Sequence, residues 1–109
     1  MAKSLLLVES KPAATASAEE YHKWHEHTHI PEMLNVEGFV SARRWRADNG
    51  ESFITLYEID TDVDTARANL NAALRDGQMS RPVAVETQPP PVMRYLSAVG
   101  DDDTCTRNG

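Results

Sequence analysis

A tight-turn signal near the middle of the chain limits the possible folds more than any other feature. Asp48-Asn49-Gly50 separates two runs rich in β-forming residues, 39–46 and 52–60. Asn-Gly tolerates the positive φ angles that two-residue hairpin turns require. The sequence therefore predicts an antiparallel hairpin here. The second run carries apolar side chains at both odd and even positions, which indicates a strand that is covered on both faces.

The segments on either side of this hairpin each predict one helix and one strand. Residues 5–9 form a short apolar run typical of a buried strand, and Ser17-Ala18-Glu19-Glu20 has the pattern of a capping box that starts a helix. A second amphipathic helix begins after the Thr61-Asp62 cap and ends at Gly77. A proline-bearing connector, 78–91, precedes a last strand at 92–99.

The predicted order of strand, helix, strand, strand, helix, strand is typical of the ferredoxin-like α+β fold, with a four-stranded antiparallel sheet and two helices on one face. We expect residues 1–99 to form this single domain and residues 100–109 to be a disordered tail. Two helices cover only one face of such a sheet, yet the first and third strands are apolar on both faces. The sequence therefore predicts a homodimer in which two sheets pack face to face, leaving a pocket between each sheet and its helices or loops.

Composition excludes several classes of function. The chain has 109 residues, of which 40% are hydrophobic and 6% aromatic, enough for one modest core. A net charge of −6 argues against nucleic-acid binding. The only cysteine, Cys105, provides neither a disulfide nor a cysteine metal cluster. The apolar run at the start ends at Glu9, too short for a signal peptide or a membrane span, so we expect a soluble cytoplasmic protein without membrane contact.

All four histidines lie within one predicted helical segment, residues 21–34. Pro31 disfavours α-helical geometry at Ile30, so the helix is expected to stop or kink near His29. At about 100° per residue, the segment divides into a core stripe and an adjoining arc, with His27 pointing elsewhere. The core stripe holds Tyr21, Trp24, Thr28 and Pro31, and the arc holds His22, His25, Glu26 and His29.

His29 is the first candidate for chemistry, with His25 as its neighbour. At a helix end the charged form of His29 is favoured by the terminal carbonyl groups, and the side chain could act as a general acid or base. The alternative is a histidine that only caps the helix. This acid/base chemistry needs no cofactor, and we expect none to be bound.

A metal site is the other use that the spacing permits. His22, His25 and His29 stand at i, i+3 and i+7, and Glu26 could add an oxygen ligand. One helix rarely supplies three ligands to one ion, because its side chains diverge from the axis. The sequence therefore favours no metal, with these three histidines as the ligands if one is bound.

A few further side chains are candidates for substrate contacts. Trp24 could form a pocket wall, although a core position is the alternative, and the phenols of Tyr57 and Tyr95 could reach a substrate or be buried core groups. Arg43 and Arg44 point to opposite faces of their strand, so at most one enters the pocket. We predict Arg43 as the group that holds a carboxylate or enolate.

Two stretches resemble a known family. Trp24 is followed five residues later by His29 and then by Pro31, and Gly38-Phe39 begins the next strand. With the order of elements, this resembles the dimeric α/β-barrel superfamily, and within it the EthD-type proteins. The resemblance spans roughly residues 5–99 and implies His29, Trp24 and Pro31 as the matching motif positions. Thr28 stands where the family usually has an acidic residue, and His25 where it often has a tyrosine.

The resemblance and the histidines together predict a cofactor-independent enzyme of the lyase, isomerase or cyclase type. It would use histidine acid/base chemistry on an oxygenated aromatic, polyketide-like or lactone-like metabolite. One alternative is a cofactor-free or heme-linked monooxygenase, because the superfamily includes such enzymes. Another is a non-catalytic protein that binds small molecules of a catabolic pathway.

Overall fold

The predicted order of elements is confirmed. The computed structural model describes residues 4–99, so the predicted tail at 100–109 lies outside the described residues. No helix within this part of the chain combines the length and apolar character needed to cross a membrane. The elements are β1 (Ser4–Ser10), the 3-10 turn η1 (Thr15–Ser17), α1 (Ala18–Trp24), the π-helical segment η2 (His25–His29), α2 (Ile30–Leu34), β2 (Phe39–Arg46), β3 (Phe53–Ile59), α3 (Val63–Arg75) and β4 (Val92–Ser97).

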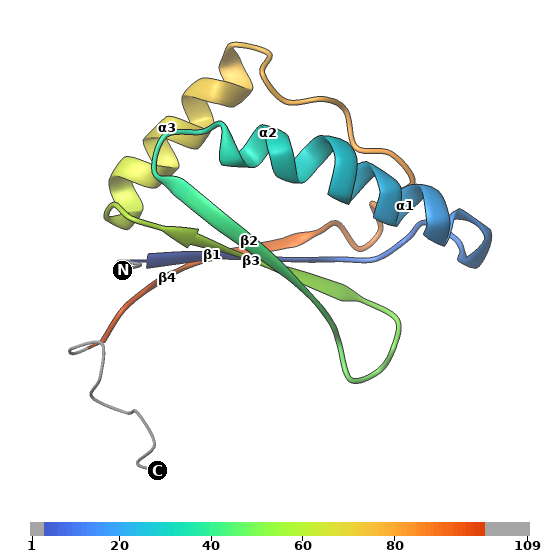
Figure 1. The fold of residues 1–109 in the computed structure, drawn as a ribbon. Helices are drawn as coiled ribbons and strands as arrows, with labels where there is room; N and C mark the ends of the chain where they lie inside the picture. The colour runs from blue at the N-terminus through green and yellow to red at the C-terminus, as the bar shows by residue number, and fades with distance from the viewer. Residues whose placement is uncertain (1–3, 100–109) are drawn as a thin grey trace.

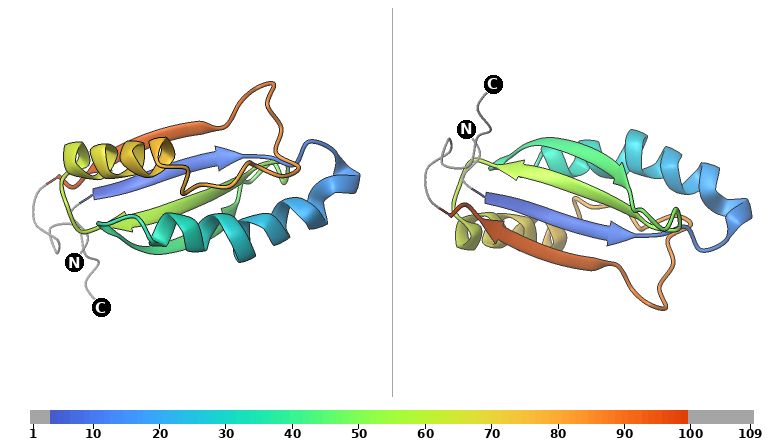
Figure 2. Two further views of the ribbon diagram at one scale, coloured as in Figure 1. Left: turned by 90° about the horizontal axis from the view of Figure 1, so that it is seen from above. Right: turned by 90° about the horizontal axis from the view of Figure 1, so that it is seen from below.

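The four strands form one antiparallel sheet in the order β2-β3-β1-β4. All the helices lie on one side of it (Figure 1), with the α1–α2 segment over one half of the sheet and α3 over the other (Figure 2). This is the α+β ferredoxin-like fold that the sequence predicts. A turn that contains Asn49 and Gly50 joins β2 to β3, so the predicted hairpin is confirmed. The turn is longer than the two residues that the Asn-Gly signal predicts, because the amide of Ala47 bonds to the carbonyl of Ser52, and of the two residues only Gly50 has a positive φ, 74°.

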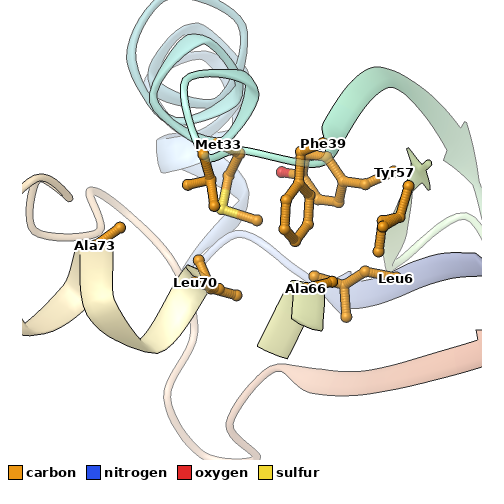
Figure 3. Close-up of a cluster of buried hydrophobic side chains, with 9 residues drawn as sticks. Leu6, Met33, Phe39, Tyr57, Ala66, Leu70 and Ala73 are labelled. Atoms are coloured by element: carbon orange, nitrogen blue, oxygen red, sulfur yellow. The ribbon is translucent and has the colours of Figure 1, made fainter. Parts of the chain in front are cut away.

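The hydrophobic core lies between the sheet and the helices. Leu6 of β1 and Tyr57 and Ile59 of β3 are fully or almost fully buried, and α3 adds Ala66 and Leu70 from its inner face. Figure 3 shows Met33 of α2 and Phe39 of β2 meeting this group from above the sheet. Burial of such side chains is the main contribution to folding, about 1.5 to 3 kcal/mol for each large one.

The first helical segment does not stop at His29, so of the two expected outcomes, a stop or a kink, the stop was wrong. The chain continues from α1 through η2 into α2, with helical dihedral angles at Trp24, His29 and Ile30. The π-helical turn from i to i+5 accommodates Pro31, which lacks an amide hydrogen and lies in the first turn of α2. Only the predicted irregularity near His29 is confirmed. Because the wider turn shifts the helix phase, Met33 is buried and Pro31 is exposed, contrary to the predicted core stripe.

The two helix starts differ in how they are capped. Asp62 accepts a hydrogen bond from the backbone amide of Thr65 at 3.4 Å, so the predicted cap of α3 is confirmed. Ser17 precedes α1 as predicted, but its side chain makes no capping hydrogen bond. The reason is that the chain enters α1 through η1, where Ser17 has φ −96° and ψ 0° instead of the extended conformation of a cap residue.

A β-bulge at the start of β2 decides which side chains face the helices. Regular alternation groups Phe39 with Ser41, Arg43 and Trp45, but the register shifts between Phe39 and Ser41. Phe39 therefore shares the helix-covered face with Ala42 and Arg44, which pair with Tyr57 and Thr55 of β3. Arg43 and Trp45 lie on the other face.

That other face of the sheet is uncovered among residues 4–99, as the view from below shows (Figure 2). Cross-strand partners place apolar side chains there from every strand, and Trp45 is 47% exposed and Val92 50% exposed. A large exposed apolar patch marks an interaction surface. The predicted homodimer through this face stays a prediction. The apolar residues of the face are Leu5, Leu7, Trp45, Ile54, Leu56, Val92 and Leu96.

We expect the Leu56→Lys variant to be a monomer and the wild-type chain to be a dimer of twice 12.1 kDa. Leu56 lies on the uncovered face opposite Leu7 and Arg43, so a lysine there adds charge to the predicted interface without entering the core. Sedimentation equilibrium measures the mass. Val83→Lys, at an exposed apolar residue of the connector, is the matched control and should stay dimeric. A monomeric wild-type chain would contradict the prediction.

Candidate functional site

Aromatic rings and imidazoles gather where α1 and η2 face the sheet. Tyr21 is the centre of this group, with its ring centroid 4.4 Å from that of His25 and 5.7 Å from that of Phe53. The Trp24 and His29 rings stack on each other, and each meets the His25 ring at close to a right angle. Arg44 of β2 places its guanidinium carbon 5.6 Å from the Tyr21 ring centroid. We call Tyr21, Trp24, His25, His29 and Arg44 the inner cluster.

His25 is a neutral imidazole with a defined tautomer. Its Nδ1 lies 2.9 Å from the carbonyl oxygen of Tyr21, and a carbonyl only accepts, so Nδ1 carries the hydrogen. In the neutral ring Nε2 is then a bare acceptor. The side chain is 5% exposed, and burial is the main cause that lowers its pKa from 6.5 to about 4, with the charge of Arg44 acting in the same direction.

His29 and Trp24 form a stacked pair. Their ring centroids are 4.5 Å apart with an interplanar angle of 14°. The pKa of His29 is lowered, because burial disfavours the charged form, while the carboxylate of Glu32 acts in the opposite direction. Nδ1 of His29 and Nε1 of Trp24 are buried and have no hydrogen-bond partner among the described residues. His29 is only partly buried, so another part of the side chain is accessible.

The position of His29 corrects the prediction about its charge. With no helix terminus at this residue, the terminal carbonyls that favour an imidazolium are absent from its surroundings, and the C-cap alternative fails for the same reason. Burial acts instead and favours the neutral form.

Arg44 interacts with His22 at the edge of the inner cluster. Its Nη1 lies 3.0 Å from Nδ1 of His22, and because a guanidinium only donates, His22 is a neutral acceptor there. Burial and the charge of Arg44 both lower the pKa of His22. The side of the cluster toward β1 is closed by a hydrogen bond of 2.6 Å between the hydroxyls of Tyr21 and Ser10. Burial raises the pKa of Tyr21, so its phenol is neutral.

The structure brings some of the predicted site residues together and separates others. His29, His25 and Trp24 are in mutual contact. Tyr57 lies deeper, in the hydrophobic core against Phe39, and burial raises its pKa.

Two predicted substrate contacts do not reach the inner cluster. Tyr95 lies toward the other helix, with the guanidinium carbon of Arg67 of α3 4.9 Å from its ring centroid. Arg43 lies on the uncovered face of the sheet, where it stacks on Trp45 at 4.9 Å. Arg44, not Arg43, belongs to the inner cluster. The reason is the bulge after Phe39, which turns Arg44 toward the helices and Arg43 to the uncovered face.

The three histidines predicted as ligands if a metal is bound do not form a shared site. Nδ1 of His25 is engaged in the hydrogen bond to the carbonyl oxygen of Tyr21. Nδ1 of His22 accepts a hydrogen bond from Arg44. Among residues 4–99, no group of three or more His, Cys, Asp or Glu side chains is placed to hold a metal ion.

Hollows open on the described surface around these elements. One of about 350 Å³ is lined by Phe53, Ala18, Lys11 and neighbouring residues, so it adjoins the inner cluster through Phe53. A second of about 300 Å³ lies between β1 and the 89–92 segment. A third of about 300 Å³ lies between the outer side of α1–η2 and Val83, with Trp24 and His27 in its wall.

The solved structures that share this fold are distant in sequence. A monooxygenase from the gene ActVA-Orf6 of Streptomyces coelicolor, solved with the ligand nanaomycin D, is 14% identical over 92% of this chain and 90% of that one, with a TM-score of 0.55. The heme-degrader MhuD of Mycobacterium tuberculosis, solved with two hemes in its active site, is 16% identical over 89% and 97%, with a TM-score of 0.59. A NIPSNAP family protein of Agrobacterium tumefaciens is 12% identical over 91% and 89%, with a TM-score of 0.61.

These similarities show the fold alone, which is the α+β ferredoxin-like fold. No protein-family model and no curated protein matches the chain.

The buried neutral state of His25 gives a prediction about stability. Between pH 6.5 and about 4 the unfolded chain binds a proton at His25 that the folded chain does not, so the free energy of unfolding falls as the pH falls through this window. The loss is about 3 kcal/mol when complete. In His25→Leu this part of the pH dependence should disappear. Urea denaturation at several pH values measures it, and equal slopes in both proteins would contradict the assignment.

Proposed function

We propose that this chain is a small enzyme of the lyase, isomerase or cyclase type that moves a proton on an oxygenated aromatic, polyketide-like or lactone-like metabolite. His29 is the general acid/base, and His25 is the neighbouring acceptor. The observation that carries the proposal is the partly buried, neutral His29 stacked on Trp24, with Nδ1 unpartnered. Unpartnered buried polar atoms are rare in folded proteins and occur at catalytic sites.

The surroundings of His29 suit a base that cycles between two protonation states. Burial lowers its pKa from 6.5, so the ring is neutral and able to accept a proton at neutral pH. Once protonated, it is stabilised by Glu32, whose charge acts in that direction. Glu32 is itself kept ionised by hydrogen bonds from the backbone amide and hydroxyl of Ser80, which lower its pKa. A positioned histidine contributes about 10² to 10⁴-fold to proton transfer.

The sequence motif supports the same residue. The spacing of Trp24, His29 and Pro31 is the part of the chain that resembles EthD-type proteins, and in the structure the first two of these are the stacked pair. The apolar Trp24 ring covers one face of the His29 ring. Because it shields this face from water, electrostatic interactions between His29 and a bound substrate become stronger.

The second candidate is a monooxygenase, favoured by one structural neighbour of that activity and one that degrades heme. Without a cofactor such a reaction also begins with deprotonation, because an electron-rich carbanion or phenolate can supply the electrons that reduce oxygen. Both candidates therefore use the same base and differ in whether oxygen is consumed.

The inner cluster does not fit a heme ligand. An axial histidine donates its second ring N–H to a carbonyl or carboxylate. His25 has such a bond but is enclosed by the Tyr21 and Trp24 rings and is 5% exposed. His29 is more accessible, but its Nδ1 has no partner within residues 4–99. The proposed chemistry therefore uses the side chains alone.

The His29→Ala variant should lose turnover by about 10² to 10⁴-fold while its melting temperature stays close to the wild-type value. His27→Ala is the matched control, because His27 is exposed on the outer side of the same segment, and it should retain full activity. The assay is a panel of enolisable aromatic ketones, polyketide fragments and lactones, followed by mass spectrometry. Full activity in His29→Ala would contradict the proposal.

The same assay separates the two candidates when it is run in an oxygen electrode. The lyase, isomerase or cyclase reading predicts turnover without oxygen uptake, and a product of unchanged oxidation level. Oxygen uptake that matches product formation would establish the monooxygenase instead.

A further inference from the structure

The guanidinium of Arg44 is the most unusual polar group of the inner cluster. Its Nε and Nη2 atoms are buried and make no hydrogen bond of normal geometry within the described residues, although the guanidinium also acts on the Tyr21 hydroxyl and works against the burial that raises the pKa of Tyr21. Within the same residues, the one ion pair joins Arg67 to Asp64, so no carboxylate neutralises Arg44. Arg44 as a whole is partly buried, but withdrawing two of its donor atoms from water without a paired anion is costly, because burial removes their hydration.

The two unpartnered atoms are adjacent, which limits the kind of group they can bind. Nε and Nη2 form one side of the planar guanidinium, and their two N–H bonds run parallel. The third nitrogen, Nη1, is already held by Nδ1 of His22 at 3.0 Å, which fixes the plane of the group. A planar anion with two oxygens, such as a carboxylate, fits the remaining side with two hydrogen bonds.

The walls around this group are aromatic. The guanidinium carbon lies 5.6 Å from the Tyr21 ring centroid and 5.7 Å from the Phe53 ring centroid. Such walls exclude water and suit the flat body of an aromatic ligand. They also favour a single negative charge over the doubly charged phosphate, because each further charge adds to the cost of burial.

We propose that Arg44 binds the carboxylate of an aromatic monocarboxylic acid side-on through Nε and Nη2. The inference names the substrate class of the proposed enzyme and in that respect rests on the proposed function. Arg44 does not line the hollow of about 350 Å³, but Phe53 both lines that hollow and lies beside the guanidinium. Binding therefore requires the Phe53 ring to move aside and open Arg44 to the hollow. The carboxylate then lies on the β2 side of the inner cluster.

Binding of paired ligands to the full chain tests this inference. Benzoate, salicylate and 1-naphthoate are compared with their uncharged primary amides by isothermal titration calorimetry. At least one acid should bind the wild-type protein about tenfold or more tightly than its amide, as expected for two charge-assisted hydrogen bonds. The Arg44 Nε–H resonance should shift when that acid is added and not when the amide is added.

Variants separate the guanidinium fork from charge alone. Arg44→Gln should remove the preference for the acid, and Arg44→Lys should reduce it, because a lysine keeps the charge without the paired donors. Arg43→Gln is the matched control, since Arg43 lies on the opposite face of the same strand, and it should keep the preference. If Arg44→Gln does not fold, the wild-type comparison and the Nε–H shift decide alone.

The outcomes distinguish this inference from the proposed function. No preference for any acid over its amide, or a preference that survives in Arg44→Gln, would overturn the carboxylate site even if turnover depends on His29. Conversely, His29→Ala should still bind the acid. If the protein binds the acid tightly but its turnover does not need His29, the carboxylate site is supported. The catalytic role of His29 is then refuted.

Discussion

The widened helical turn from His25 to His29 is the constraint on which the rest of the site depends. In a regular α-helix, positions four residues apart drift by about 40° around the axis at each step. The π-helical turn removes this drift, so that His25 and Met33 are both buried and His29 is partly buried between them. It also allows the helix to continue past Pro31. One local irregularity thus turns two imidazoles toward the sheet.

The chemical character of the inner cluster follows from that burial. Desolvation is the largest cause of the lowered pKa values of His22, His25 and His29. The positive charge of Arg44 acts in the same direction on His22 and His25. The result is a set of neutral imidazoles beside one cation with unused donors, which suits removal of a proton from a substrate whose product is an anion.

Much of the fold could be predicted from the sequence because its signals are local. The Asn49-Gly50 turn signal, the β-forming run in 52–60 and the apolar stripe of α3 each depend on neighbouring residues, and the bounds of β2 agree with the predicted 39–46. The errors arise where tertiary structure overrides a local rule. Pro31 predicts a stop or a kink, because the sequence does not show that a π-helical turn allows the helix to continue past it.

The site was less predictable for the same reason. The contacts of His29, His25 and Trp24 follow from their proximity in one helix, so this part of the site could be anticipated. Whether Arg43 or Arg44 faces the helices depends on a single bulge in β2, between Phe39 and Ser41. The sequence pattern of β2 does not reveal this bulge. Partners such as Phe53 and Ser80 are distant in sequence from the histidines, and no periodicity connects them.

The central claim is that His29 removes a proton from a bound carbon acid. Deuterium incorporation into an enolisable aromatic ketone in heavy water measures this step directly, without requiring the complete reaction. The account predicts that the wild-type protein accelerates exchange and keeps this activity down to pH 6.5, because the pKa of His29 lies below that value. Exchange that is no faster with the wild-type protein than with His29→Ala would contradict it.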